Sequence, residues 1–203
     1  MPEKILRVAW LSVLLGIGME LILVLVATGV GVTQSLKPIA ADLVQKVSWS
    51  MFVCVGLALG NGAAKHRGVA MGVAGLVAAP LAFNAARTLH KGATQLLAVA
   101  GPAAMLPPPV TIALIKAVEY AFLGTMWSRL SSRAKGAKPY AMLGLVTGAV
   151  TAAVIIGLAF QAGAKPSTAA LIIRTVNEVI FPMGCSLVLY ASDTMGRTKF
   201  GRS

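Results

Sequence analysis

Six long apolar stretches, separated by short polar or basic segments, dominate the pattern of this sequence. A helix needs about 20 apolar residues to cross the hydrocarbon core of a bilayer. The stretches cover residues 5–30, 49–64, 68–86, 110–130, 140–163 and 167–190. The pattern predicts an all-α, polytopic membrane helix bundle with six transmembrane helices. We expect a single transmembrane domain over residues 1–203, ending in a polar cytoplasmic tail over 191–203.

Three connecting regions leave the helix count or the local structure open. Apolar residues recur at helical spacing over 36–47, which favours a short amphipathic helix lying on the membrane surface. The basic run at 65–67 allows only a tight turn, so spans two and three form either two helices or one bent element. The segment 93–106 is broken by Pro102 and is too short to span. It is either re-entrant or a packed surface loop.

Composition and charge agree with a membrane location. The chain is 57% hydrophobic and only 12% charged, about half the charged fraction of soluble domains. A net charge of +12 would suggest nucleic acid in a soluble protein, but here the basic residues mostly lie between apolar stretches. We therefore expect no nucleic-acid partner, and anionic membrane lipid at the basic loops.

The distribution of Lys and Arg also predicts an orientation. With six spans, most of the 18 basic residues fall on the side of both termini, whereas five or seven spans would divide the strongest basic loops. By the positive-inside rule, both termini are cytoplasmic. The sequence thus predicts a multi-pass protein of a bacterial-type inner (plasma) membrane. Trp10, Trp127, Tyr140 and Tyr190 fall near span ends, as residues of an interfacial aromatic belt do.

Spans three–four and five–six resemble each other. Leu114–Phe122 aligns with Ile172–Phe181 after one inserted residue, and Ala70–Gly75 aligns with Ala141–Gly148. The two pairs point the same way, which predicts a parallel two-helix internal repeat. Gly16 and Gly18 make span one a candidate third copy of the Gly-rich first helix, and the bundle would then consist of three hairpins.

Pairs of glycines four residues apart predict which helix faces pack inward. Small residues at this spacing let membrane helices approach closely. The pairs are Gly56/Gly60, Gly68/Gly72 and Gly144/Gly148. They do not establish dimerisation, and a homo-oligomer remains one arrangement open to the chain.

Polar residues near the middle of the spans are the candidate substrate- or ion-binding site. They are Glu20, Lys116, Glu119, Arg174, Asn177 and Glu178. A charged side chain at the bilayer centre costs roughly 2.5–3.5 kcal/mol on insertion scales, so these residues must face one another, face water, or be neutral. The structural alternative is that Lys116–Glu119 and Arg174–Glu178 form ion pairs that only stabilise the bundle. The functional alternative is a polar site or pathway at the midplane.

Glu20 bears on this choice because no basic residue lies within a helical turn of it. Either Glu20 reaches across the bundle to Lys116 or Arg174, or it is protonated. Protonated, it leaves two acids and two bases in balance, and the basic pair can then receive an anion. Ionised, it gives the cluster an excess negative charge suited to a proton or a monovalent cation.

No other chemistry is indicated by the motifs. Cys54 and Cys185 both lie in apolar runs and predict buried free thiols, and His66 and His90 lie at loop positions. No nucleophile triad, metal motif or nucleotide-binding loop is present, so we expect no cofactor and no enzyme, although a lipid enzyme using Glu119 or Glu178 stays open. We expect a small transporter or channel moving a proton, cation or small ion or solute. The alternative is a non-transporting membrane subunit that recognises a partner.

Overall fold

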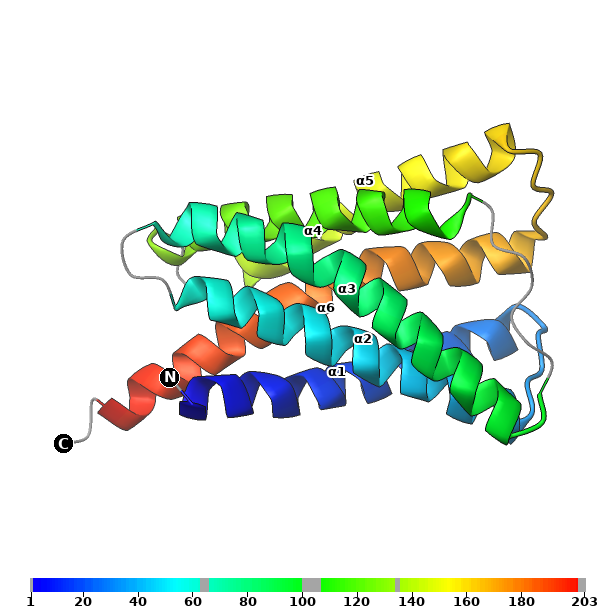
Figure 1. The fold of residues 1–203 in the computed structure, drawn as a ribbon, viewed down its shortest axis with the longest axis horizontal. Coiled ribbons are helices and arrows are strands. Elements are labelled where there is room, and N and C mark those ends of the chain that lie inside the picture. Colours follow the sequence, from blue (N-terminus) through cyan, green and yellow to red (C-terminus); the bar gives the residue numbers. More distant parts are fainter. Residues whose placement is uncertain (1, 63–65, 100–106, 134–135, 201–203) are drawn as a thin grey trace.

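The structure, a computed structural model, describes residues 2–62, 66–99, 107–133 and 136–200, with side chains described as far as 196. In this part of the chain all regular secondary structure is α-helix, and no strand is present. The helices are α1 (Pro2–Gly29), α2 (Leu36–Asn61), α3 (Arg67–Leu96), α4 (Pro109–Ser131), α5 (Lys138–Gln161) and α6 (Thr168–Phe200) (Figure 1). All six are long and apolar enough to span a membrane. The predicted fold class is therefore confirmed.

Several helices are longer than the sequence predicted. The segment 36–47 is the first part of α2, so the prediction of a separate surface helix is wrong. Ala41 is fully buried there, which shows that this part of α2 belongs to the bundle. The bent-element alternative is also wrong, because α2 and α3 are two helices. Residues 93–96 belong to α3, residues 100–106 of the predicted re-entrant segment lie outside the described residues, and α6 continues into the predicted tail.

The helices form a closed ring in chain order. Each helix packs against the next, and α1 packs against α6, which also contacts α2 and α4 across the interior. Both termini lie at one end of the bundle, where Lys4 of α1 forms an ion pair with Asp193 of α6 (Figure 1). We call this the terminal end and the opposite one the loop end. At the loop end the chain turns after α1 and α5 at Gly31 and Gly163, whose φ angles of 80° and 82° favour glycine.

Glycines set the close approach within each helix hairpin. A Cβ on Gly148 of α5 would lie 2.6 Å from the Glu178 carbonyl oxygen of α6, and a Cβ on Gly75 of α3 would collide with the Tyr120 carbonyl of α4. A Cβ on Gly16 of α1 would lie 2.6 Å from Val47 Cα of α2. In two hairpins the contact therefore falls at or beside the glutamate of the second helix, at equivalent places of the predicted repeat.

All but one of the glycines in the predicted pairs lie at such contacts. Gly72, Gly144 and Gly148 face a neighbouring helix closely, and so do Gly56 and Gly60. Gly68 has no atom within 4 Å of an added Cβ, so its predicted packing role is wrong. Gly68 is the second residue of α3, where the helix has only begun to approach its neighbours.

Aromatic side chains fill the interior at two levels. Trp49 meets Phe83, Tyr120 and Phe181 edge to face, with ring centroids 6.3, 5.9 and 6.5 Å away, and so joins α2, α3, α4 and α6. Nearer the terminal end, the Tyr140 ring lies 5.4 Å from the Trp127 ring and 4.8 Å from the Tyr190 ring.

This second aromatic group corrects the predicted belt. Trp127 and Tyr140 are only 1% and 3% exposed, so they pack inside the bundle instead of facing lipid headgroups. The indole N–H of Trp127 donates to the Ser186 carbonyl at 3.1 Å, which satisfies its one polar group internally. Trp10 is 65% exposed, as an interfacial anchor would be.

We expect Gly148→Ala to destabilise the protein by about 1–3 kcal/mol, because the new methyl group overpacks the α5–α6 contact. Gly157→Ala is the matched control, since it lies on the same helix with nothing within 4 Å of its added Cβ. Thermal unfolding of the purified protein in detergent measures both. Equal midpoints for the two variants would contradict the contact described here.

Candidate functional site

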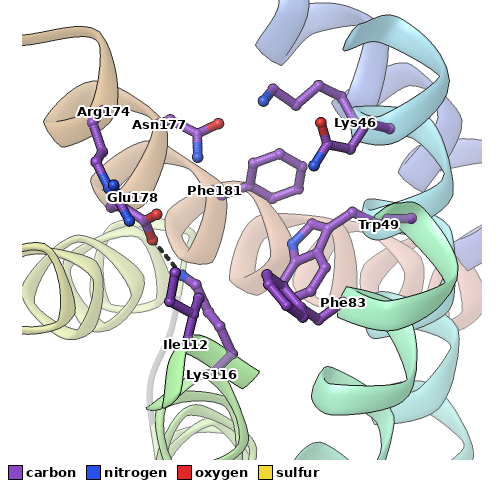
Figure 2. Close-up of a pocket in the computed structure, with 11 residues that line it drawn as sticks. Lys46, Trp49, Phe83, Ile112, Lys116, Arg174, Asn177, Glu178 and Phe181 are labelled. Atoms are coloured by element: carbon purple, nitrogen blue, oxygen red, sulfur yellow. Dashed lines mark hydrogen bonds and ion pairs between the residues drawn. The ribbon is translucent and has the colours of Figure 1, made fainter. Parts of the chain in front are cut away.

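A polar cavity of about 240 Å³ lies between α2, α3, α4 and α6, in the half of the bundle toward the loop end (Figure 2). Its walls contain charged side chains, two amide side chains and aromatic rings. They are formed by Gln45, Lys46, Trp49, Phe83, Ala86, Ile112, Lys116, Arg174, Asn177, Glu178 and Phe181. The cavity therefore reaches from the loop end down to the Trp49 aromatic cluster.

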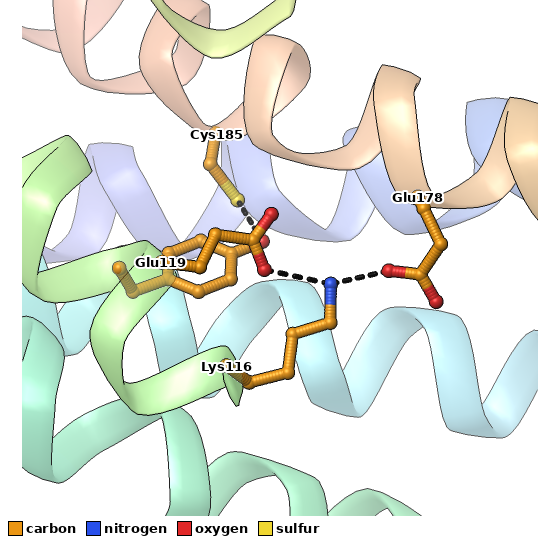
Figure 3. Close-up of polar contacts among 5 residues, drawn as sticks. Lys116, Glu119, Glu178 and Cys185 are labelled. Carbon is orange, nitrogen blue, oxygen red and sulfur yellow. Dashed lines mark hydrogen bonds and ion pairs between the residues drawn. The ribbon is translucent and has the colours of Figure 1, made fainter. Parts of the chain in front are cut away.

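A buried network of three charged residues joins α4 and α6 beside this cavity. The Lys116 ammonium donates to Glu119 Oε2 at 2.7 Å and to Glu178 Oε2 at 2.5 Å (Figure 3). The side chains are 8%, 0% and 9% exposed, respectively. The predicted Lys116–Glu119 pair is therefore present. The predicted Arg174–Glu178 pair is not formed, because Glu178 reaches the long Lys116 side chain on the neighbouring helix instead.

The network places two carboxylates on one ammonium. Its polar groups are not all satisfied, since Glu119 Oε1 is buried and accepts no hydrogen bond within normal geometry from the described residues. Thr151 of α5 lies close to the Glu119 side chain. Glu119 also lines a second, apolar groove of about 570 Å³ between α4 and α5. The network thus separates the polar cavity from a groove on the outer side of the bundle.

Arg174 and Lys46 supply further positive charge to the cavity wall. Neither forms an ion pair within 4 Å in the described part of the chain. In Figure 2 they lie on opposite sides of the pocket, Arg174 on α6 and Lys46 on α2. Between them α6 contributes Asn177, whose Oδ1 atom is buried and lacks a hydrogen-bond donor among the described residues. These polar groups are therefore available to a ligand.

Glu20 lies apart from the other predicted site residues. It is 5% exposed on α1 and does not line the cavity. It makes no ion pair within 4 Å in the residues described, so the predicted reach to Lys116 or Arg174 is wrong. Glu20 lies on α1, which contributes no residue to the cavity, and its charged neighbours are Lys46 and Asp42 of α2. Of the predicted set, Lys116, Arg174, Asn177 and Glu178 line the cavity, and Glu119 is tied to it through Lys116.

The sequence reasoning missed Lys46 and Asp42. Both were assigned to a surface helix, whereas Lys46 lines the cavity and Asp42 lies 3.0 Å from His90 Nε2 of α3. No Gly or Pro interrupts the chain between Pro38 and Gly56, and this continuity was the signal that one helix carries both residues into the bundle.

Two further features bear on the chemistry. The described residues hold no group of three or more His, Cys, Asp or Glu side chains that could bind a metal ion. Cys54 and Cys185 are fully buried free thiols, and their sulfur atoms touch at 3.1 Å where α2 meets α6.

Comparison with known proteins found no family model, no curated sequence and no solved structure that matches this chain.

We expect Lys116→Met to cost about 3–5 kcal/mol of stability, because it leaves two buried carboxylates without their shared cation. Adding Glu119→Gln and Glu178→Gln to this variant should recover most of the loss, since no buried charge then lacks a partner. Lys37→Met, at an exposed position of α2, is the control. The test is the unfolding midpoint in detergent. A Lys116→Met midpoint equal to that of Lys37→Met would show that the network does not stabilise the bundle.

Proposed function

We propose that this protein is a small membrane transporter that moves an ion or small solute through the cavity between α2, α3, α4 and α6. The observation that carries the proposal is the cavity itself, which places Lys46, Arg174, Asn177 and Glu178 around an open space inside six apolar helices. Charged residues within a bilayer are costly and typically mark ion or substrate pathways. A purely structural role would give Lys46 and Arg174 ion-pair partners, and neither has one within 4 Å among the described residues.

The packing below the cavity favours a carrier over a channel. Trp49 and Phe181 bound the cavity on the side of the terminal end. Beyond them the interior is filled by side chains with 0% exposure, including Cys54, Leu57 and Leu123. A solute bound in the cavity must therefore wait for these helices to rearrange before it can leave at the terminal end, as in alternating access.

α6 offers a place for such a rearrangement. Pro182 lies inside α6, one turn after Glu178, and has no N–H to donate to the Glu178 carbonyl. The half of α6 that carries Arg174, Asn177 and Glu178 is thus joined to the rest of the helix at a point with one backbone hydrogen bond fewer. A bend at Pro182 would move these three polar cavity residues together with Phe181.

We further propose that the terminal end is cytoplasmic and that the membrane is a bacterial-type inner membrane. Arg67, Arg129, Arg133 and Lys138 are exposed near this end, which suits the positive-inside rule and contact with anionic lipid headgroups. In that orientation the cavity lies nearer the outer side. Labelling of single cysteines introduced at exposed positions 133 and 163 in intact and opened cells tests the orientation.

We expect Glu178→Gln to reduce uptake at least tenfold, because it disturbs both the cavity wall and the network, and Glu20→Gln to abolish it while leaving expression intact. Proteoliposomes are incubated with a mixture of small organic anions, amino acids and inorganic cations, and lumenal solutes are identified by mass spectrometry. Glu3→Gln, exposed in the first turn of α1, is the matched control.

Wild-type uptake by the Glu20→Gln variant would contradict the role given to that residue. A wild-type protein that retains no more solute than empty liposomes would contradict the transport proposal. A stoichiometric partner recovered in mild detergent from such an inactive preparation would support the non-transporting subunit instead.

A further inference from the structure

We infer that the cavity binds a small organic monoanion with an apolar body, and that Glu20 takes up one proton together with this anion. The inference rests on the proposed carrier function and names its substrate class and coupling ion. It is carried by three features: the charges on the cavity wall, the aromatic floor, and the fact that Lys46 both lines the cavity and is a charged neighbour of the buried Glu20.

The charges decide the sign of the ligand. Glu178 is the one carboxylate on the described wall, and it is already bonded to Lys116. Lys116 is shared with Glu119, so the network carries one excess negative charge when all three groups are ionised. Lys46 and Arg174 add two positive charges, which leaves one positive charge in excess. A bound monoanion makes this buried site neutral, and a bound cation would raise its charge further.

The donors and the rings decide the shape of the ligand. Lys46, Arg174 and the amide nitrogen of Asn177 can all donate to an anionic head, and charge-assisted hydrogen bonds of this kind are strong. Trp49, Phe83 and Phe181 add apolar rings to the lining of the same cavity. The volume of about 240 Å³ is below the usual range for drug-sized ligands. The structure therefore fits a small anion with an apolar body.

Glu20 connects the anion to a proton through Lys46. The titratable groups that α2 presents to Glu20 are Lys46 and Asp42, and Asp42 is bonded to His90 of α3. α6 also packs against α1. Its charged residues Arg174 and Glu178 belong to the cavity wall, which Glu20 does not line. An ionised Glu20 offsets the charge of Lys46. A protonated Glu20 leaves Lys46 to the anion, so proton and anion favour each other's binding.

The test uses benzenesulfonate, an aromatic monoanion that stays ionised from pH 5.5 to 8.0, so that any pH dependence belongs to the protein. Binding to the purified full-length protein is measured by the shift of its unfolding midpoint. Benzoate, phenylalanine, benzene-1,3-disulfonate and tetraethylammonium provide a second monoanion, a zwitterion, a dianion and a cation. We expect the wild type to bind both monoanions best, and benzenesulfonate at least tenfold more tightly at pH 5.5 than at pH 8.0.

The variants separate the two parts of the inference. Lys46→Met and Arg174→Met should each weaken benzenesulfonate binding at least tenfold, while Lys37→Met should not. Glu20→Gln, which mimics the protonated residue, should bind equally well at both pH values. A Glu20→Gln variant with the wild-type pH dependence would overturn the coupling. Absence of binding by both monoanions, or tighter binding of tetraethylammonium, would overturn the anion site.

These results are distinguishable from failure of the transport proposal. Anion binding with the expected pH dependence, in a protein that accumulates nothing in liposomes, would support the anion site and contradict the carrier. Accumulation of an inorganic cation without any anion binding would support the carrier and contradict the anion site.

Discussion

The sharing of one lysine ammonium between two glutamates is the interaction on which the interior of this bundle depends. Lys116 and Glu119 come from α4 and Glu178 from α6, so the contact ties together two inner helices that are not neighbours in the ring. Removing charges from water is costly, and the attraction among them offsets this cost only when the geometry is good. The network therefore fixes the separation of α4 and α6, and with it the width of the cavity above.

Helix packing around this network follows from small residues. Gly148 lets α5 lie directly on the backbone of α6 at Glu178, and Gly75 does the same for α3 at Tyr120, the residue after Glu119. Each buried glutamate is thus covered from behind by a glycine-bearing helix. This close packing leaves the side chains of Glu119 and Glu178 free to meet Lys116 between α4 and α6.

The fold was predictable because hydropathy and helix length are local properties. Six apolar stretches became six helices, although α2 and α6 extended well beyond the apolar segments. The charged partners were not predictable, because a pairing depends on which helices meet. Arg174 and Glu178 had suitable spacing along α6, yet Glu178 bonds to Lys116 of α4. Lys46 was overlooked because a polar start to a membrane helix resembles a surface helix in sequence.

The structure brings most of the predicted site residues together for the same reason. Charged and strongly polar residues near the centre of a span face the interior because lipid does not solvate them, and five of the six lie around the cavity or its network. Glu20 is equally buried, but α1 does not line the cavity, and the charged neighbours of Glu20 are Lys46 and Asp42 of α2. Depth along a helix can be inferred from sequence, whereas direction around the bundle requires the packing.

The two touching thiols in the core have a practical consequence for studies of this protein. Cys54 and Cys185 have 0% exposure and lie against each other inside the bundle, beyond the reach of water-soluble maleimides. The natural chain therefore serves as an unreactive background into which single reporter cysteines can be introduced. Spectroscopic probes could follow helix movement without first replacing residues that fill the interior.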